Sequence, residues 1–475
     1  MKLSFIQFFN KKSLNLDAKA KYIQIGFAML ANFSILSTGM GLGYPAITTQ
    51  ILAKDTTLIL TESQVSWFAS ITAIACPFGG PITAYLTNKF GRKGTLIIID
   101  VISIIQWIII GFSSRSDAQI LFIQLMFARV LTGLTIGMIT TPAVLYSAEI
   151  CHPSLRGRMT VLSTPFFVAI GILLIYLLGY LLKEDYRLVA IYSLGITIFT
   201  LLICFFIPES PVHLILKNKL KTARHVLSKV RHLANDDPRI DEEIHQIQKN
   251  SQSSVSKTSS LSIFREFSKP QLYKPFMIML AFFTIQQLSG VFVIFVYTAQ
   301  FSIEAGVSID AFLSTVIIGI IRCVMTFAAA FLSDKVGRKP LAIVSSIGMF
   351  ISMTGLALSS EFSLKDTQYF WVPAALLYFF VSIGTIGILV LPFSMVAEMY
   401  PQKSRSLAVA LSLSYCFIVS FLTIKFFSTA FMAFGSAVVF AFFAVISLIA
   451  VFFSIYVLPE TKGKTLHEIE KHFQK

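Results

Sequence analysis

Four pairs of charged residues recur along the sequence at nearly constant spacing. The pairs are Arg92 with Arg338, Glu149 with Glu398, Arg156 with Arg405, and Glu209 with Glu460, at separations of 246 to 251 residues. Carboxylates and guanidinium groups form charge-assisted hydrogen bonds, so these residues suit ion pairs between helix ends. The alternative is that they are solvated loop charges that only set topology. Their regular spacing predicts two duplicated halves with a binding path at their interface.

A second group of polar residues lies inside long apolar stretches. Gln286 and Gln287 are adjacent. Because an amide both donates and accepts hydrogen bonds, the pair suits ligand binding or a polar clamp between helices. Arg322 lies about ten residues into another apolar stretch, with no acidic residue at similar depth. An unpaired cation is costly there, so Arg322 either contacts a ligand, through hydroxyls or an anionic group, or bonds backbone carbonyls or cavity water.

The elements that must position these residues are apolar segments. The chain has 475 residues, of which 55% are hydrophobic and 13% charged, and its mean hydropathy is +0.75. Twelve segments are near the length that crosses a hydrocarbon core of about 30 Å. Spanning segments must satisfy their backbone hydrogen bonds internally. We therefore expect an all-α membrane protein with twelve transmembrane helices in two pseudo-symmetric six-helix bundles.

Hydrophilic intervals divide the chain into five expected parts. They are a cytoplasmic tail at 1–21, a first bundle at 22–208, a cytoplasmic linker with short helices at 209–273, a second bundle at 274–458 and a second cytoplasmic tail at 459–475. With the N-terminus placed inside, 31 Lys and Arg residues fall on the inner side and five on the outer side. This asymmetry predicts cytoplasmic termini, and it explains the net charge of +15 as topology rather than nucleic-acid binding.

The sequence offers no pattern typical of catalysis or metal binding. Its five cysteines lie in or beside apolar segments at spacings that suit neither a metal site nor disulfides. A catalytic triad, a metal cluster and a phosphate-binding loop are all missing from the sequence. We therefore expect neither an enzyme nor a bound cofactor.

Several motifs occur in an order that is typical of one family. They are Arg129, Tyr146 and Glu149 followed by Arg156 and Gly157, the run 208–211, the run 286–290 with Tyr297, the run 334–339, and the run 459–470. Over essentially its whole length the chain resembles the sugar porter family of the major facilitator superfamily. Within that family it is most similar to the facilitated trehalose transporters of insects.

The resemblance implies transport by alternating access, in which two bundles rock about a central sugar site. In similar proteins, glutamines at the positions of Gln286 and Gln287 bond sugar hydroxyls. The charged motifs are implied to stabilise the outward-facing state. The gating residues carried over are Arg92, Glu149, Arg156, Glu209, Asp334, Arg338, Glu398, Arg405 and Glu460. The implied partners are a small-molecule sugar and the lipid bilayer of the plasma membrane, and the oligomeric state stays open.

The sequence departs from the family pattern where the sugar site is expected. Phe292, Arg322 and Cys416 replace asparagines, Phe393 replaces a tryptophan, and Thr164 lies where a glutamine is missing. The candidate substrate-binding residues are Gln286, Gln287, Tyr297, Arg322, Phe393, Thr164, Phe292 and Cys416. A site that loses hydroxyl-binding partners loses affinity. Ordinary glucose as the substrate therefore does not follow from the resemblance.

The first expected span bears on how transport is driven. Residues 22–44 contain no Asp or Glu that could carry a proton, and we expect Asp100 to lie too near the cytoplasm to replace one. The sequence therefore favours facilitated diffusion of a hexose or of trehalose. The alternatives are a proton-coupled sugar symporter and a sugar sensor that does not transport.

Overall fold

The architecture is a bundle of long helices. The computed structural model describes residues 18–54, 60–114, 116–182, 185–254, 267, 269–307, 309–363, 368–401, 404–464 and 466–474. Within these residues all regular structure is helical, and ten helical segments are long and apolar enough to cross a membrane. Two of them, of 50 and 52 residues, leave helical geometry at Gly91 and Gly435. Each supplies two spans, so the total is twelve, and the expected fold class is confirmed.

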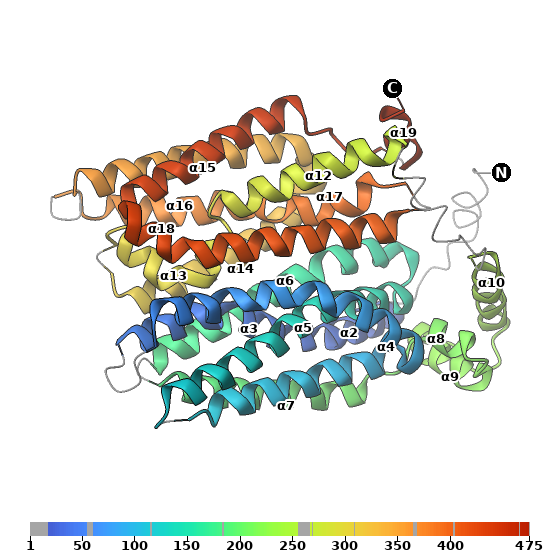
Figure 1. Ribbon diagram of the computed structural model, residues 1–475. Coiled ribbons are helices and arrows are strands. Elements are labelled where there is room, and N and C mark those ends of the chain that lie inside the picture. Colours follow the sequence, from blue (N-terminus) through green and yellow to red (C-terminus); the bar gives the residue numbers. More distant parts are fainter. Residues whose placement is uncertain are drawn as a thin grey trace.

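The first half contains six spans. Its helices are α2 (Ala18–Asn32) and α3 (Ser34–Lys54), which form the first span, α4 (Glu62–Gly111), α5 (Ala118–Ile150), α6 (Pro153–Leu181) and α7 (Tyr186–Phe206). Three short helices follow, α8 (Pro211–Leu216), α9 (Leu220–Arg231) and α10 (Pro238–Ser254). These three helices lie together beyond one end of the bundle (Figure 1).

The second half repeats this plan. Its helices are α12 (Pro270–Leu288), α13 (Val293–Glu304), α14 (Ala311–Val336), α15 (Arg338–Glu361), α16 (Val372–Gly384), the π-helical turn η2 (Thr385–Leu389), α17 (Leu391–Met399), α18 (Arg405–Tyr456) and α19 (Leu466–His472). In Figure 1, α19 lies at the same end of the bundle as α8 to α10. We call this end the linker end and the opposite end the far end.

Two glycines make equivalent turns at the linker end. Gly91 has φ of 84° and Gly337 has φ of 112°, in the region that strongly favours glycine. A Cβ on Gly337 would lie 2.7 Å from Oε2 of Glu460, and one on Gly91 would meet the carboxylate of Glu209 in the same way. Each turn therefore leaves room for a carboxylate that arrives from the last span of its own half.

At the far end, aspartates cap the helices that begin there. Asp117, Asp185 and Asp310 each accept hydrogen bonds from two backbone N–H groups, at the starts of α5, α7 and α14 respectively. The first N–H groups of a helix have no partner within the helix, so each cap contributes about 1 kcal/mol. These caps therefore fix the residues at which α5, α7 and α14 begin.

The two halves meet along three helix pairs. Helix α14 lies against α6, α13 against α3, and α18 against α4, while each half has a large apolar cluster made almost entirely of its own residues. Gly319 lets α14 approach α6 closely, because an added Cβ would lie 3.0 Å from Leu173 Cδ1 and 3.1 Å from Tyr176 Cδ2. This interface holds the candidate site.

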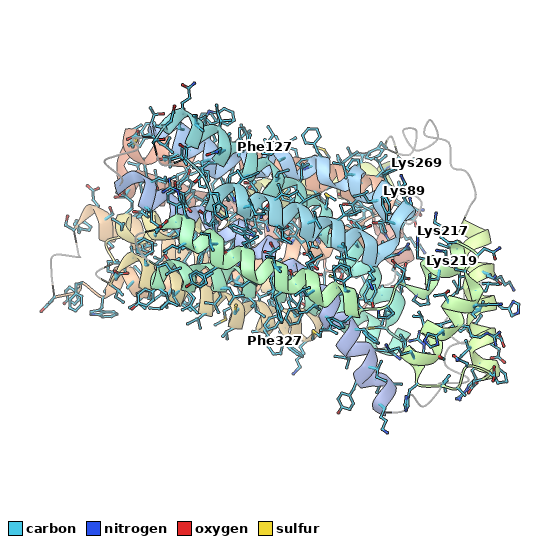
Figure 2. The ribbon with its side chains drawn as sticks, turned by 90° about the horizontal axis from the view of Figure 1, so that it is seen from below. Lys89, Phe127, Lys217, Lys219, Lys269 and Phe327 are labelled. Carbon is cyan, nitrogen blue, oxygen red and sulfur yellow. The ribbon has the colours of Figure 1, made fainter. Side chains whose placement is uncertain are left out.

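The surface suits a bilayer. Figure 2 shows Phe127 and Phe327 on the sides of the bundle and Lys89, Lys217, Lys219 and Lys269 towards the linker end. The two phenylalanines are 56% and 49% exposed. Large apolar side chains at this exposure are stable against lipid, and lysines prefer the water beyond it. The protein is therefore a multi-pass membrane protein.

Candidate functional site

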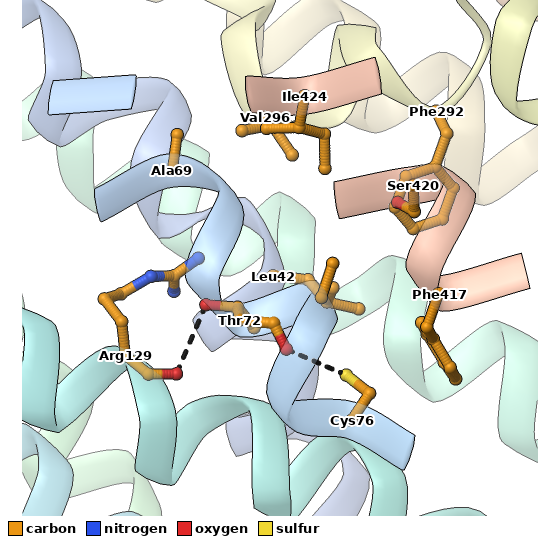
Figure 3. Close-up of a pocket in the computed structure, with 11 residues that line it drawn as sticks. Leu42, Ala69, Thr72, Cys76, Arg129, Phe292, Val296, Phe417, Ser420 and Ile424 are labelled. Atoms are coloured by element: carbon orange, nitrogen blue, oxygen red, sulfur yellow. Dashed lines mark hydrogen bonds between the residues drawn. The ribbon is translucent and has the colours of Figure 1, made fainter. Parts of the chain in front are cut away.

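A small pocket lies between the halves, and we call it the central pocket. It is lined by Leu42, Ala69, Thr72, Ala73, Cys76 and Arg129 of the first half and by Phe292, Val296, Phe417, Ser420 and Ile424 of the second. Figure 3 shows these side chains facing one another across the interface. The space open to the centre of a water molecule is about 20 Å³. That is room for one or two waters, so in this conformation the central pocket is too small to hold a sugar.

Arg129 holds the first-half wall of the central pocket together. Its Nε donates to the carbonyl of Phe68 at 3.2 Å and its Nη1 to the carbonyl of Gly41 at 2.6 Å. The hydroxyl of Thr72 donates to the Arg129 carbonyl at 3.3 Å (Figure 3). Arg129 thereby ties α3, α4 and α5 at one depth. On the facing wall, the Ser420 hydroxyl is buried, has no partner among the residues described, and is available to a ligand.

The two glutamines lie inside the second half. Gln286 Nε2 donates to the carbonyls of Ile388 and Leu389 at 3.1 and 2.7 Å. These carbonyls belong to the π-helical turn η2 and its end, where the regular α-helical pattern is interrupted. Gln287 Nε2 donates to Sγ of Cys416 at 3.1 Å. In this conformation the amides clamp helices together, and neither glutamine lines the central pocket.

The other predicted site residues are spread around the interface. Phe292 lines the central pocket. Tyr297 is buried, and its hydroxyl donates to the Ile424 carbonyl at 3.4 Å. Phe393 is 39% exposed and packs on Phe283 with ring centroids 5.5 Å apart. The Thr164 hydroxyl is buried, and no described residue forms a hydrogen bond with it. The structure therefore brings Phe292 to the central pocket, and the other predicted site residues do not line it.

Arg322 lies in the middle of α14 at the interface with the first half. It is 8% exposed, and its guanidinium carbon stands 3.2 Å from the centroid of the Phe295 ring. Its Nη1 is buried and has no hydrogen-bond partner among the described residues. One turn further along α14, Thr326 lines a second cavity, the side pocket, which is enclosed by α6, α14 and the η2–α17 region.

At the linker end, the first half contains a closed network of charges, the N-half network. Arg92 Nη2 contacts Glu149 Oε1 at 2.7 Å, and the Arg92 backbone N–H donates to Glu209 Oε1 at 2.9 Å. The Ser210 hydroxyl donates to the other oxygen of Glu149. His213 Nδ1 lies 3.2 Å from Arg92 Nη1, and burial lowers the pKa of His213 below its ordinary value. His213 is therefore neutral at pH 7 and can accept from Arg92.

The second half contains the matching C-half network. Arg338 Nη2 contacts Glu398 Oε1 at 2.9 Å, and the Arg338 backbone N–H donates to Glu460 Oε1 at 3.1 Å. The Thr461 hydroxyl donates to Glu398 Oε2 at 2.7 Å. Partial burial raises the pKa of Glu460, but backbone N–H groups, led by that of Lys462, outweigh it and hold this pKa below its usual range. The carboxylate is therefore ionised.

Three further gating candidates are placed differently. The side chains of Arg156 and Asp334 lie outside the described part of the chain. Arg405 Nε donates to the Tyr400 carbonyl at 3.4 Å, and its Nη2 is buried without a partner in the described part of the chain. In the part of the chain that is described, no hydrogen bond or ion pair links the N-half network to the C-half network. These charges hold the linker ends of the helices together within each half.

Contacts between the halves lie nearer the far end. Lys425 Nζ of α18 donates to Ser66 Oγ at 2.7 Å and to the Ser63 carbonyl at 3.2 Å, and it lies over the Trp67 ring. The Tyr176 hydroxyl of α6 bonds the Phe295 carbonyl at 3.0 Å. Lys425 is not among the predicted site residues. Its partners on α4 cannot be identified from spacing, because they come from the other half.

The sequence also gave no sign of some pocket residues. Thr72, Cys76 and Ser420 are small side chains that look like ordinary packing residues. Asp100 was expected near the cytoplasm, but it is fully buried and accepts from the Ser34 hydroxyl of the first span at 2.8 Å. The third span begins immediately after the Gly91 turn. Asp100 consequently lies about 12 Å inside that span.

Two six-span halves with repeated motifs and a pocket between them define a secondary transporter of the two-bundle class. The model of the family described as "Sugar (and other) transporter" matches residues 5–473. The chain belongs to this sugar transporter family, as the motifs led us to expect.

Relatives within the family include insect proteins. Over 450 residues the chain is 31% identical to the facilitated trehalose transporter Tret1 of Bombyx mori, which covers 93% of this chain and 86% of that protein. It is 29% identical over 460 residues to Tret1 of Anopheles gambiae, covering 94% of this chain and 56% of that protein. The chain thus spans little more than half of the mosquito protein's length.

Solved structures show the same fold. The inward open conformation of the xylose transporter XylE from E. coli matches with a TM-score of 0.77 at 20% identity, over 94% of this chain and 99% of that one. The proton:xylose symporter XylE bound to 6-bromo-6-deoxy-D-glucose matches with a TM-score of 0.73 at 21% identity, over 95% and 100%. At these identities the likeness establishes the architecture and leaves the substrate open.

Proposed function

We propose that this chain carries a sugar across the plasma membrane by facilitated diffusion, with both termini in the cytoplasm. The observation that carries the proposal is the arrangement around the central pocket. Hydrogen bonds join the halves near the far end through Lys425 and Tyr176, while the ion pairs described in each charged network at the linker end, Arg92–Glu149 and Arg338–Glu398, lie within one half. Two rigid bundles that separate at one end at a time are what alternating access requires.

The facilitated mode is supported by the first span. Helices α2 and α3, which form it, contain no Asp or Glu. A proton-coupled carrier needs a group in the translocation path that binds and releases the proton. The named insect relatives are facilitated transporters of trehalose, so trehalose and hexoses are the first substrates to test.

Orientation follows from the position of basic residues. Exposed lysines gather towards the linker end (Figure 2), where the short helices and α19 also lie. Because positive residues are retained on the cytoplasmic side, we assign the linker end to the cytoplasm and the far end to the outside. In this assignment the conformation described here is closed towards the outside.

The test is uptake of labelled trehalose and labelled glucose into transport-deficient cells that express the full chain, with and without a proton ionophore. Saturable uptake that the ionophore leaves unchanged is the expected result. Surface labelling of the protein accompanies each assay. Absence of uptake for every sugar tested, with the protein present at the surface, would overturn the proposal and favour a sensor.

A second candidate, proton-coupled symport, is favoured by one observation. Asp100 is fully buried, its Oδ2 accepts from Ser34 at 2.8 Å, and its Oδ1 has no hydrogen-bond partner within the residues that the structure describes. A buried carboxyl group without a cation tends to bind a proton. If the ionophore abolishes sugar accumulation and Asp100→Asn retains exchange but loses accumulation, symport replaces facilitated diffusion.

A further inference from the structure

Two arginines are buried deep in the spans, one in each half, and they differ in what they bind. Arg129 of α5 donates to two backbone carbonyls, those of Phe68 and Gly41. Arg322 of α14 is 8% exposed and makes no hydrogen bond or ion pair with the described residues, and its Nη1 is enclosed without an acceptor. The scaffold explains the burial of Arg129. It leaves that of Arg322 unexplained.

The residues around Arg322 contact the flat face of its guanidinium group, but the described ones do not accept hydrogen bonds from the N–H groups at its edge. The Phe295 ring lies under the guanidinium, with the centroid 3.2 Å from the central carbon. A stacked guanidinium uses its face for the ring and keeps its in-plane N–H groups for acceptors. The nearby Tyr176 hydroxyl is already bonded to the Phe295 carbonyl and to Thr298 Oγ1. The N–H groups at the edge of the Arg322 guanidinium therefore have no acceptor among the described residues, and a ligand could supply one.

The position of Arg322 puts those donors beside the path between the halves. Phe295 packs on Phe292, with ring centroids 5.7 Å apart, and Phe292 lines the central pocket. On the other side, Thr326 lines the side pocket one turn along α14. Arg322 thus lies at the α14–α6 interface, which must open when the bundles rock. The Phe295 and Phe292 rings separate it from the central pocket, and one helical turn separates it from the side pocket. A ligand that moves through this interface would meet the edge of the guanidinium.

The charge balance points to the chemistry of that ligand. Among the described acidic residues, Asp100 is the one that lies well inside a span, and it is bonded to Ser34 and Cys204 in the other half. A buried cation without a counter-charge is costly. A carboxylate would supply both the charge and two oxygens that match the guanidinium fork.

We propose that Arg322 binds the carboxylate of a sugar acid, so that monoanionic sugars such as hexuronates belong to the substrate class. This inference rests on the proposed function, because it assumes that a sugar passes through the interface. Facilitated movement of a monoanion carries one negative charge. Its uptake therefore responds to membrane potential, whereas uptake of a neutral sugar does not.

The experiment uses the full chain in proteoliposomes with labelled D-glucuronate, D-glucose and trehalose. We expect saturable glucuronate uptake that is slowed by an inside-negative potassium–valinomycin potential. Arg322→Gln is expected to lower kcat/KM for glucuronate by about 10- to 100-fold, as for loss of a charged hydrogen bond. The loss for the neutral sugars should be smaller than the loss for glucuronate. Arg322→Lys keeps the charge but not the two-pronged guanidinium geometry, so its kcat/KM for glucuronate should lie between those of the unmodified chain and Arg322→Gln.

The matched control is Arg187→Gln. Arg187 lies at the start of α7 and donates to Ser113 Oγ and the Ser114 carbonyl, away from the interface, so the ratio of glucuronate to glucose uptake should be unchanged. The potential dependence is measured on the unmodified chain and does not depend on the folding of a variant.

Three outcomes would contradict either the inference about Arg322 or the proposed transport of sugars. Uptake of glucose or trehalose without glucuronate uptake overturns the inference and leaves the proposed function standing. Equal loss of all three sugars in Arg322→Gln, at unchanged thermal stability, shows a structural arginine and overturns it as well. Failure of all three sugars with the unmodified chain overturns the proposed function itself.

Discussion

The linker end and the far end of the bundle hold the helices together in different ways. At the linker end, Arg92 and Glu149 pair within the first half, and Arg338 and Glu398 pair within the second. At the far end, Lys425 of the second half reaches α4 of the first. One end thus makes each half rigid, and the other joins the halves. We infer that the repeated charges hold each bundle together during movement, while the non-repeated contacts determine which end is closed.

This division follows from what each contact must survive. A bundle that rocks as a rigid body keeps its internal contacts in every state, so the most buried ion pairs belong inside it. A contact between halves breaks once in each cycle, so it must be weak. The partly exposed Lys425 meets that need, because an ammonium near water contributes little and releases easily.

The largest effect should come from breaking a linker-end network through its turn. In Gly337→Ala, a residue with a side chain is forced to φ of 112°, and its Cβ would lie 2.7 Å from the Glu460 carboxylate. We expect a loss of about 2–4 kcal/mol in stability, from the unfavourable backbone and the weakened charged hydrogen bonds. Sugar uptake should fall about 10-fold. Thermal unfolding of the purified protein and uptake assays measure these changes.

The control for this prediction is another glycine in a span. Gly195 of α7 has no atom within 4 Å of an added Cβ. Gly195→Ala should therefore alter stability by less than about 0.5 kcal/mol, or increase it slightly. If Gly337→Ala proves as stable as Gly195→Ala, the turn does not hold the C-half network in place.

A smaller effect is expected when the far-end contact is removed. Lys425→Met loses the hydrogen bonds to Ser66 and Ser63 and the contact with Trp67. A partly exposed contact of this kind contributes about 0.5–1 kcal/mol, so the population open at the far end should rise about two- to fivefold. Cys76, which lines the central pocket and is 3% exposed, is the natural reporter. Its rate of modification by a membrane-impermeant maleimide from the far side, followed by mass spectrometry, should rise by that factor.

The matched variant is Lys425→Arg, which keeps a cation within reach of the same acceptors and should leave the Cys76 rate near that of the unmodified chain. An unchanged rate in Lys425→Met would mean that apolar contacts alone close the far end. In that case the proposed difference between the two ends would concern packing rather than polar contacts.

Much of the linker end could be predicted from the sequence. The spacing of Arg92 and Arg338, and of Glu149 and Glu398, placed four charges at equivalent positions, and duplication required equivalent partners. The number of spans followed from apolar length alone. These features depend on short-range patterns that recur, so they can be read from the chain before any tertiary contact is known.

The candidate site could be predicted less well, because its contacts depend on local distortions and on the meeting of two halves. The clamp made by Gln286 uses carbonyls of the π-helical turn, which the sequence does not reveal. The isolation of Arg322 depends on which neighbours already have partners, as Tyr176 does. The sequence can indicate that no acidic residue lies at the depth of Arg322 in the membrane, but only the structure shows the Phe295 ring beneath it.

The smallest expected effect distinguishes the two linker-end networks by pH. His213 lies beside Arg92 in the N-half network, whereas the position 251 residues later is the exposed Lys464. The charged groups around His213 are Glu209, Arg92, Lys217 and Glu149, and burial lowers the pKa of His213. A histidine whose pKa is lower in the folded chain binds fewer protons when folded. Stability is therefore full above the ordinary value of about 6.5 and falls as pH drops below it.

His213→Gln isolates this contribution, because glutamine can still accept from Arg92 but does not titrate. Between pH 7.5 and 5.5 the unmodified protein should lose on the order of 1–2 °C more in Tm than the variant. Equal pH dependence in the two proteins would assign the loss to other groups. Glu398 and Glu460 belong to the C-half network, which has no histidine at the matching position, so Glu398→Gln should leave this particular difference intact. The pH response would then belong to one half of a structure whose remaining charges are paired almost identically in both.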